Sequence, residues 1–286
     1  MTAENAAERM ECMEVWGGNR FARRAVRKAG VDLWIYSKPV GDDDSGGDVY
    51  YVSSCASGRI TRMLLADVSG HGLPVASIAA NLRDLMRRYI NFVSQTRFVS
   101  AMNRAFSTPV DQGGFATAVV STYFAPTRSL TMSIAGHPPP FIYRSARREW
   151  HRCDEQSNPA LPLGVTTEAQ YGEAQISLEA DDILLCYTDA LIETRDADAN
   201  LLGVDGLLNV VQTLDASDLD QFVDLLLEKL SAMHGDNLQT DDVTVLLVRA
   251  NRLSVRWRDN LLAPVRLIGD ILNRRRLDRQ VQRQLP

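Results

Sequence analysis

Residues 59–92 read RITRMLLADVSGHGLPVASIAANLRDLMRRYINF and combine an apolar run, a short loop and a long helical pattern. The run Arg59–Asp67 is predicted to be a buried strand that ends on an aspartate. After Pro74, apolar residues recur every three or four positions from Val75 to Phe92, a spacing typical of a helix with one buried stripe. The sequence therefore predicts a buried strand that ends in Asp67 and is followed by a long helix.

Similar patterns predict five more strands and two more helices along the chain. The strands are Phe115–Phe124, Ser129–Ala135, Phe141–Arg144, Asp182–Thr188 and Val243–Val248, and the helices are Phe98–Phe106 and Ser217–Met233. Ser217 is the expected N-cap of the last helix, with Asp220 three residues later. Because several strands follow one another without intervening helices, the order favours an α+β fold with a largely antiparallel sheet over an alternating βαβ fold.

Charge divides the chain into an acidic body and a basic tail. The 286 residues include 31 basic and 36 acidic side chains, which gives a net charge of −5. Nine arginines and three aspartates give residues 251–286 a net charge of +6, which leaves −11 on residues 1–250. The acidic body argues against a nucleic-acid binder, which would need a basic field. We therefore expect an N-terminal segment 1–29, for which a helix is one option, a globular domain 30–250 and a basic amphipathic tail 251–286.

The tail interleaves apolar residues with arginines, so three interpretations stay open. Such a helix can lie on an anionic membrane as a peripheral contact, pack on a partner, or fold back on the acidic body. No apolar run approaches the 18 or more residues that a spanning helix needs. The four cysteines are scattered and are expected to be reduced thiols of a cytoplasmic protein.

Acidic residues recur where predicted strands meet turns. They are Asp48 in SGGDVYY, Asp67 after RITRMLLA, Asp189 at the end of DILLCYTD, and Asp241 with Asp242 at the start of DDVTVLLV. Any one of them could be only a helix cap or a solvated turn, but strands that each present an aspartate at one end gather carboxylates at one edge of a sheet. Clustered carboxylates repel one another unless a cation neutralises them, and oxygen ligands suit Mg²⁺ or Mn²⁺. The pattern predicts a dinuclear site of the kind that holds both the attacking and leaving oxygens of a phosphoryl group.

Six blocks in order resemble the RsbU/SpoIIE-like branch of the metal-dependent serine/threonine protein phosphatases, the PPM or type 2C family. The blocks are S-G-G-D-V-Y-Y (45–51), A-D-V-S-G-H-G (66–72), F-A-T-A (115–118), A-G-H-P-P-P (135–140), Y-T-D-A-L-I-E (187–193) and D-D-V-T (241–244). The resemblance covers roughly residues 30–250. It implies a four-layer α/β/β/α sandwich of two mainly antiparallel sheets, with two divalent cations, Mn²⁺ or Mg²⁺, at one end of the facing sheets.

The resemblance also implies roles for individual residues. Asp67 would bridge both metals, and the backbone carbonyl of Val68 would ligate one of them. Asp189 and Asp241 would complete the other site, which makes Asp67, Asp189 and Asp241 the implied catalytic set. Asp48 would ligate the second metal directly or through water.

Several neighbouring residues are left with more than one interpretation. Asp242 remains an alternative ligand, although neighbours on a strand point to opposite faces. Gly46 and Gly47 would let the backbone turn tightly before Asp48. His71 is either a general acid or a structural residue, whereas His137, followed by three prolines, is expected to be structural. Ala190 stands where the family usually has glycine, and it would be strained by about 1 kcal/mol or more if that position needs a positive φ.

The resemblance implies a metal-dependent serine/threonine protein phosphatase. Its substrate would be a phosphoserine or phosphothreonine on a bacterial regulatory protein of the STAS, anti-anti-sigma type, hydrolysed through a water bridging two metals. This implies a role in signal transduction and sigma-factor regulation. The alternative is a catalytically weak or inactive PPM-fold binding module. A two-metal nuclease is disfavoured because the body has no basic groove, no nucleic-acid partner is expected, and a homodimer remains possible.

Overall fold

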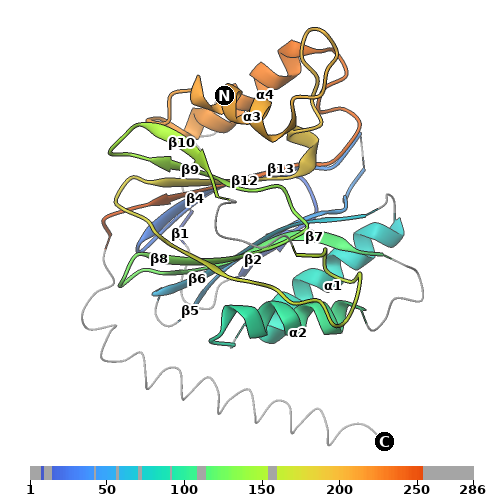
Figure 1. Ribbon diagram of the computed structural model, residues 1–286, viewed down its shortest axis with the longest axis vertical. Helices are drawn as coiled ribbons and strands as arrows, with labels where there is room; N and C mark the ends of the chain where they lie inside the picture. The colour runs from blue at the N-terminus through green and yellow to red at the C-terminus, as the bar shows by residue number, and fades with distance from the viewer. Residues whose placement is uncertain are drawn as a thin grey trace, which may run out of the picture.

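The computed structural model describes residues 8–9, 15–41, 43–55, 58–69, 73–90, 92–107, 114–153 and 160–253. Two sheets face each other, with helices on both outer sides (Figure 1). The first sheet contains, in spatial order, β1 (Glu8–Arg9), β3 (Ala22–Lys28), β4 (Val31–Lys38), β13 (Val243–Ala250), β12 (Ile183–Tyr187), β9 (Phe141–Arg144) and β10 (Glu149–Arg152). The second contains β11 (Ala174–Ser177), β8 (Ser129–Ala135), β7 (Ala116–Phe124), β6 (Ile60–Val68), β5 (Asp48–Cys55) and β2 (Val15–Gly18).

Helices cover the outer face of each sheet. The helices α1 (Leu73–Tyr89) and α2 (Gln95–Ser107) pack on the second sheet, and α3 (Gly203–Gln212) and α4 (Leu219–Met233) pack on the first. A single 3₁₀ turn, η1 (Asp189–Leu191), follows β12. All strand pairs are antiparallel except β1 with β3. The α+β class and the four-layer α/β/β/α sandwich are therefore confirmed.

The layers explain why the central strands are apolar along their whole length. In β6, Met63 and Leu65 face the core between the two sheets, while Leu64 and Ala66 face α1 and α2. Because successive side chains of a strand point to opposite faces, a strand buried on both faces reads as a continuous apolar run rather than an alternating one.

The N-terminal segment differs from the expectation of a helix. The described parts of residues 1–29 are strands, and β2 and β3 belong to the two sheets of the sandwich. At the end of β3 the exposed Arg27 lies between the buried Val26 and Lys28, which is a two-residue period and not a helical one. The sandwich therefore begins well before residue 30.

The expected N-cap of the last helix was also wrong by one residue. Asp218 caps α4, and its side chain accepts hydrogen bonds from the backbone N–H groups of Asp220 and Gln221. The Ser217 hydroxyl instead donates to Asp215. Asn251 and Leu253 continue β13 by hydrogen bonds with Gly30, and residues 254–286, which hold most of the basic tail, lie outside the described residues.

The helices and the cysteines also bear on the expectations from the sequence. No helix of the described residues is long and apolar enough to cross a membrane. Cys153 and Cys186 are buried cysteines, whereas Cys12 and the side chain of Cys55 lie outside the described part of the chain.

Candidate metal centre

Four predicted aspartates meet at one end of the sandwich because of how the strands are paired. The register of β5 and β6 places Asp48 directly opposite Asp67. The antiparallel pairing of β12 with β13 brings Asp189, just after β12, to the same end as Asp241, just before β13. The first pair comes from the second sheet and the second pair from the first sheet, so the site lies where the ends of the two sheets face each other.

A hydrogen bond joins the two sheets at this point. The buried hydroxyl of Thr188 donates to Oδ2 of Asp48 at 2.9 Å, and it accepts from the backbone N–H of Thr244 at 3.0 Å. Asp48 belongs to the second sheet, whereas Thr188 and Thr244 belong to the first. The hydroxyl thus fixes the orientation of the Asp48 carboxylate relative to the opposite sheet.

The carboxylates shift one another's pKa values upward. Burial, and then the charges of Asp189 and Asp241, raise the pKa of Asp67 to about 7. Burial and the nearby Asp67 raise the pKa of Asp48 well above its ordinary value. The pKa values of Asp189 and Asp241 are also raised, first by burial and then by Glu193 and Asp189 respectively. Such mutual repulsion is what a bound cation relieves.

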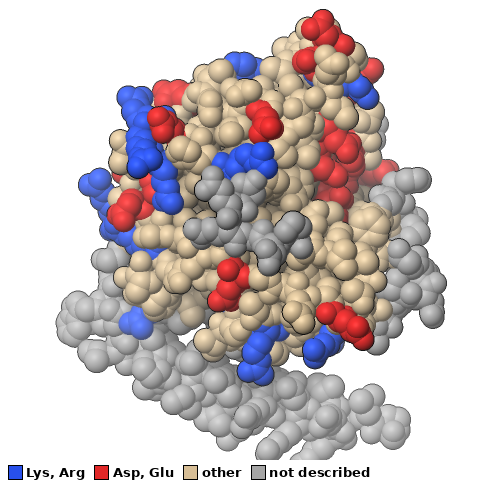
Figure 2. Space-filling view, viewed as in Figure 1, with Lys and Arg blue, Asp and Glu red and all other residues tan. Residues whose placement is uncertain are grey.

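Acidic side chains gather at one edge of the molecule, as Figure 2 shows on its right-hand side. This is the end at which β6 leads into α1 in Figure 1. Lysine and arginine side chains, with some acidic ones among them, gather at the opposite edge, on the side of the β9–β10 turn in Figure 1. The body is therefore polarised rather than uniformly acidic.

The Asp242 carboxylate is held by backbone N–H groups of the loop between β4 and β5 and of the first residue of β5. Its Oδ1 accepts from the backbone N–H of Val40 at 2.7 Å, and its Oδ2 accepts from those of Gly47 at 2.5 Å and Asp48 at 3.3 Å. Both carboxylate oxygens are thus occupied by backbone donors. These contacts give Asp242 a role in holding the loop before Asp48, while its charge contributes to the raised pKa values of Asp48, Asp67 and Asp241.

Gly46 and Gly47 are required for a different reason from the one expected. Neither has a positive φ. A Cβ on Gly46 would collide with the Asp242 carboxylate, and a Cβ on Gly47 would lie 2.9 Å from the backbone oxygen of Val68. The two glycines therefore allow a close approach of the chain to Asp242 and to the proposed carbonyl ligand.

The structure also bears on Ala190 and His137, two further residues singled out in the sequence. Ala190 lies in η1 without a positive φ, so alanine is accommodated there without the backbone strain considered above. The buried His137 lies 2.8 Å from the Thr117 hydroxyl and 3.0 Å from the backbone oxygen of Tyr187, which confirms a structural role. His71 lies outside the described residues.

Three residues of the site were not identified from the sequence. Glu193 raises the pKa values of Asp67 and Asp189, and Thr188 and Thr244 hold Asp48 as described. All three lie within the blocks at 187–193 and 241–244. Glu193, four positions after Asp189, could have been found as a further acidic residue of its block, whereas Thr188 and Thr244 are of a residue type that is common in strands.

The donor set fits hard divalent cations, with water completing their coordination. The carboxylates offer only oxygen atoms, and burial and repulsion disfavour their ionisation in the absence of a cation. Among the described residues, no three histidine, cysteine, aspartate or glutamate side chains are grouped closely enough to hold one ion by themselves. Mg²⁺ commonly takes only one or two carboxylates and keeps several waters, so a sparse set of this kind is compatible with it.

Comparisons with known proteins agree with this geometry. Residues 57–251 match the family model of Stage II sporulation protein E (SpoIIE). The chain is 23% identical over 227 residues to phosphoserine phosphatase RsbU of Bacillus subtilis (strain 168), an alignment that covers 79% of this chain. The chain spans 65% of the length of that curated relative.

Two solved structures share the fold. The PP2C phosphatase domain and a regulatory fragment of SpoIIE from Bacillus subtilis superimpose with a TM-score of 0.64 at 18% identity, covering 84% of this chain and 64% of that one. RsbX in complex with magnesium superimposes with a TM-score of 0.59 at 16% identity, covering 80% of this chain and 100% of that one. Since the family model extends over more than half of the residues and the fold agrees, this chain belongs to the SpoIIE family.

Proposed function

We propose that this protein is a metal-dependent serine/threonine protein phosphatase. The observation that carries the proposal is the convergence of Asp48, Asp67, Asp189 and Asp241 on one end of the two sheets, with the pKa values of all four raised by burial and by the charges of neighbouring carboxylates, Glu193 among them. Membership of the SpoIIE family and the likeness to phosphoserine phosphatase RsbU support this chemistry.

Asp67, Asp189, Asp241 and the backbone carbonyl of Val68 would hold two divalent cations, with Asp48 as a further ligand, direct or through water. Bound cations would neutralise phosphoryl oxygens and lower the pKa of water, which is the assistance that phosphate-ester hydrolysis most needs. The magnesium complex of RsbX supports the choice of ion. Asp67 has the central place, because its pKa responds to the charges of Asp189 and Asp241 at once.

The other residues of the site position these ligands. Thr188 orients the Asp48 carboxylate from the opposite sheet, and Asp242 fixes the backbone of Gly47 and Asp48. With these contacts made, the Asp48 carboxylate is set by a buried hydrogen bond and its backbone is held by a second carboxylate. Pre-organised charge of this kind is generally the largest contribution to catalysis.

For the substrate, we propose a phosphorylated regulatory protein of the STAS, anti-anti-sigma type. The support is the likeness to the phosphoserine phosphatase RsbU. The acidic edge would repel a phosphoprotein in the absence of metal, so cation binding and substrate binding should be coupled.

The test is hydrolysis of an aryl phosphate and of a phosphorylated STAS protein in Mn²⁺ or Mg²⁺. Asp67→Asn and Asp189→Asn should each lower the rate by about 100-fold or more, the scale of losing one pre-organised electrostatic contact. Asp84→Asn is the matched control, because Asp84 is an exposed aspartate on α1 that only pairs with nearby arginines. A wild-type protein that binds the phosphorylated partner without hydrolysing either substrate would favour the inactive binding module.

A further inference from the structure

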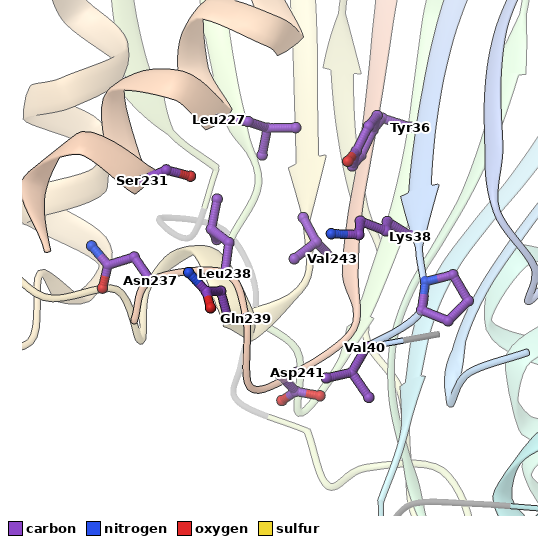
Figure 3. A pocket seen from close by; sticks show the side chains of 12 residues that line it. Tyr36, Lys38, Val40, Leu227, Ser231, Asn237, Leu238, Gln239, Asp241 and Val243 are labelled. Atoms are coloured by element: carbon purple, nitrogen blue, oxygen red, sulfur yellow. The ribbon is translucent and has the colours of Figure 1, made fainter. Parts of the chain in front are cut away.

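A cavity of about 460 Å³ opens beside Asp241, on the side away from Asp67's own sheet. Its walls come from the end of β4, from α4 and from the loop that leads into β13 (Figure 3). Asp241 lies at its lower rim in this view, separated from the polar side chains above it. A substrate segment that places a phosphate at the carboxylate cluster would therefore have this cavity within reach of its neighbouring residues.

The wall of the cavity carries one cation. Figure 3 shows the ammonium group of Lys38 pointing into the cavity, with the hydroxyl groups of Tyr36 and Ser231 above it. No described residue forms a hydrogen bond or ion pair with that ammonium group, and Lys38 is exposed. Burial raises the pKa of Tyr36, so its hydroxyl remains a neutral donor. These three hydrogen-bond donors favour a ligand group that is an anion or a strong hydrogen-bond acceptor.

Leu238, among polar residues on the wall opposite Lys38, has an unusual backbone conformation. Leu238 has a φ of 60°, which is costly for a residue with a Cβ and tends to be kept at functional sites. Asn237 holds this loop, since its Nδ2 donates to the carbonyls of Arg195 and Leu230 and its Oδ1 accepts from the Arg195 N–H. Leu238 and Val243 thus present a fixed apolar surface to the cavity.

We propose that this cavity is a specificity subsite that receives an acidic side chain flanking the phosphorylated residue of the substrate, with its carboxylate on the ammonium group of Lys38. The methylene groups of a glutamate or aspartate would pack on Leu238 and Val243. This proposal rests on the proposed function for the position of the phosphate at the Asp241 edge. Charge complementarity selects the occupant, because Lys38 is the only cation among the described residues that line the cavity.

The test measures binding of phosphopeptides in which a phosphonate replaces the phosphate ester, so that no turnover occurs. One set carries glutamate, and the other lysine, at each of the four positions on either side of the phosphoresidue. Fluorescence anisotropy in Mg²⁺ should show that the wild type binds the best glutamate peptide about 10-fold more tightly than its lysine counterpart, because an exposed charge pair adds up to about 5-fold in affinity and the lysine peptide meets a like charge.

Charge reversal identifies the residue responsible. Lys38→Glu should reverse the preference and Lys38→Gln should abolish it. Lys229→Glu is the control, because Lys229 is a half-buried lysine on α4 that contacts Thr213 outside the cavity, and it should keep the wild-type preference. Equal binding of both sets by the wild type, or an unchanged preference in Lys38→Glu, would overturn the proposal.

The two proposals fail separately. An aryl phosphate has no flanking residues, so absence of its hydrolysis counts against the phosphatase activity alone, whereas the peptide preference reports on the cavity whether or not turnover occurs. Thermal unfolding of Lys38→Glu should match that of the wild type, since Lys38 is exposed.

Discussion

At the scale of single residues, Asp241 and Asp242 show how adjacent carboxylates take opposite roles. Asp241 faces two cavities at the acidic edge, and Asp242 faces inward and receives three backbone N–H groups. The sequence alone does not distinguish these two aspartates. Their hydrogen bonds do, because Asp242 holds a loop by accepting hydrogen bonds from backbone N–H groups, whereas Asp241 is a proposed metal ligand.

Asp242→Asn should destabilise the metal-free protein by roughly 2 kcal/mol, because an amide NH₂ would face a backbone donor where a carboxylate oxygen now accepts. Urea unfolding without metal measures this loss. Asp241→Asn is the natural comparison, since it removes repulsion and should leave metal-free stability nearly unchanged while reducing stabilisation by Mg²⁺. Loss of the Mg²⁺ effect in Asp242→Asn, with no change in metal-free stability, would instead make Asp242 the ligand.

Sequence patterns identified the charged residues of the site but not their supports. A strand-end aspartate is visible because it interrupts an apolar run, as at Asp67 and Asp189. Thr188 and Thr244 carry no such signal, because threonine is also an ordinary strand residue. The opposite orientations of Asp241 and Asp242 followed from strand geometry, yet which of the two faced the cluster depended on the loop at Val40 and Gly47, far away in the sequence.

At the scale of secondary-structure elements, His137 connects the two sheets. Its Nε2 lies 3.0 Å from the carbonyl oxygen of Tyr187, at the end of β12, and must therefore donate. The Nδ1 then accepts from the Thr117 hydroxyl on β7. This tautomer makes the neutral ring a bridge between β7 and β12, and burial lowers the pKa of His137 to about 4.

The histidine bridge should make the protein less stable in acid. Between about pH 6.5 and pH 4 the unfolded chain binds a proton at His137 that the native state excludes, so the free energy of unfolding falls as the pH falls. The full loss is on the order of 3 kcal/mol and is reached only below pH 4. Chemical unfolding at several pH values measures it.

His137→Gln isolates this contribution, because it removes the titrating ring while the raised carboxylate pKa values elsewhere remain. The wild-type and variant curves should converge as the pH falls from 7 to 4.5. Parallel curves over that range would show that the ring is not kept neutral by the fold.

Elements with one dominant pattern were predicted well, and the missed elements mix several patterns. The predicted strands Ser129–Ala135 and Phe141–Arg144 match β8 and β9. In β4 the buried Asp32 interrupts the apolar run, and its compensation comes from Arg249 at 3.0 Å, more than 200 residues away. The helix α3 contains two glycines, which weaken a helical pattern, and it is held instead by packing on the first sheet.

At the scale of the whole molecule, the carboxylates at one end of the sandwich repel one another, and a bound cation would relieve this repulsion. Binding of cations to the native state alone stabilises the fold by mass action, by about 3 kcal/mol when the free ion is at 100 times its dissociation constant. For a domain of this size each kcal/mol raises the melting temperature by roughly 2–4 °C.

Mg²⁺ or Mn²⁺ should therefore raise the melting temperature by about 5–10 °C in differential scanning fluorimetry. Potassium chloride at equal ionic strength is the control for general screening, and EDTA should reverse the effect. The same titration with Asp67→Asn should give a much smaller rise. An equal rise with potassium chloride would indicate screening of the acidic edge rather than a specific site.

The position of β13 adds a consequence for biosynthesis. This strand lies between β4 and β12 in the first sheet, and Asp241 immediately precedes it. A growing chain on the ribosome therefore cannot assemble the carboxylate cluster until nearly all of the described residues have emerged. Ordered cation binding would then begin only with the completed sandwich, which makes the site a marker of finished folding as well as the place of proposed chemistry.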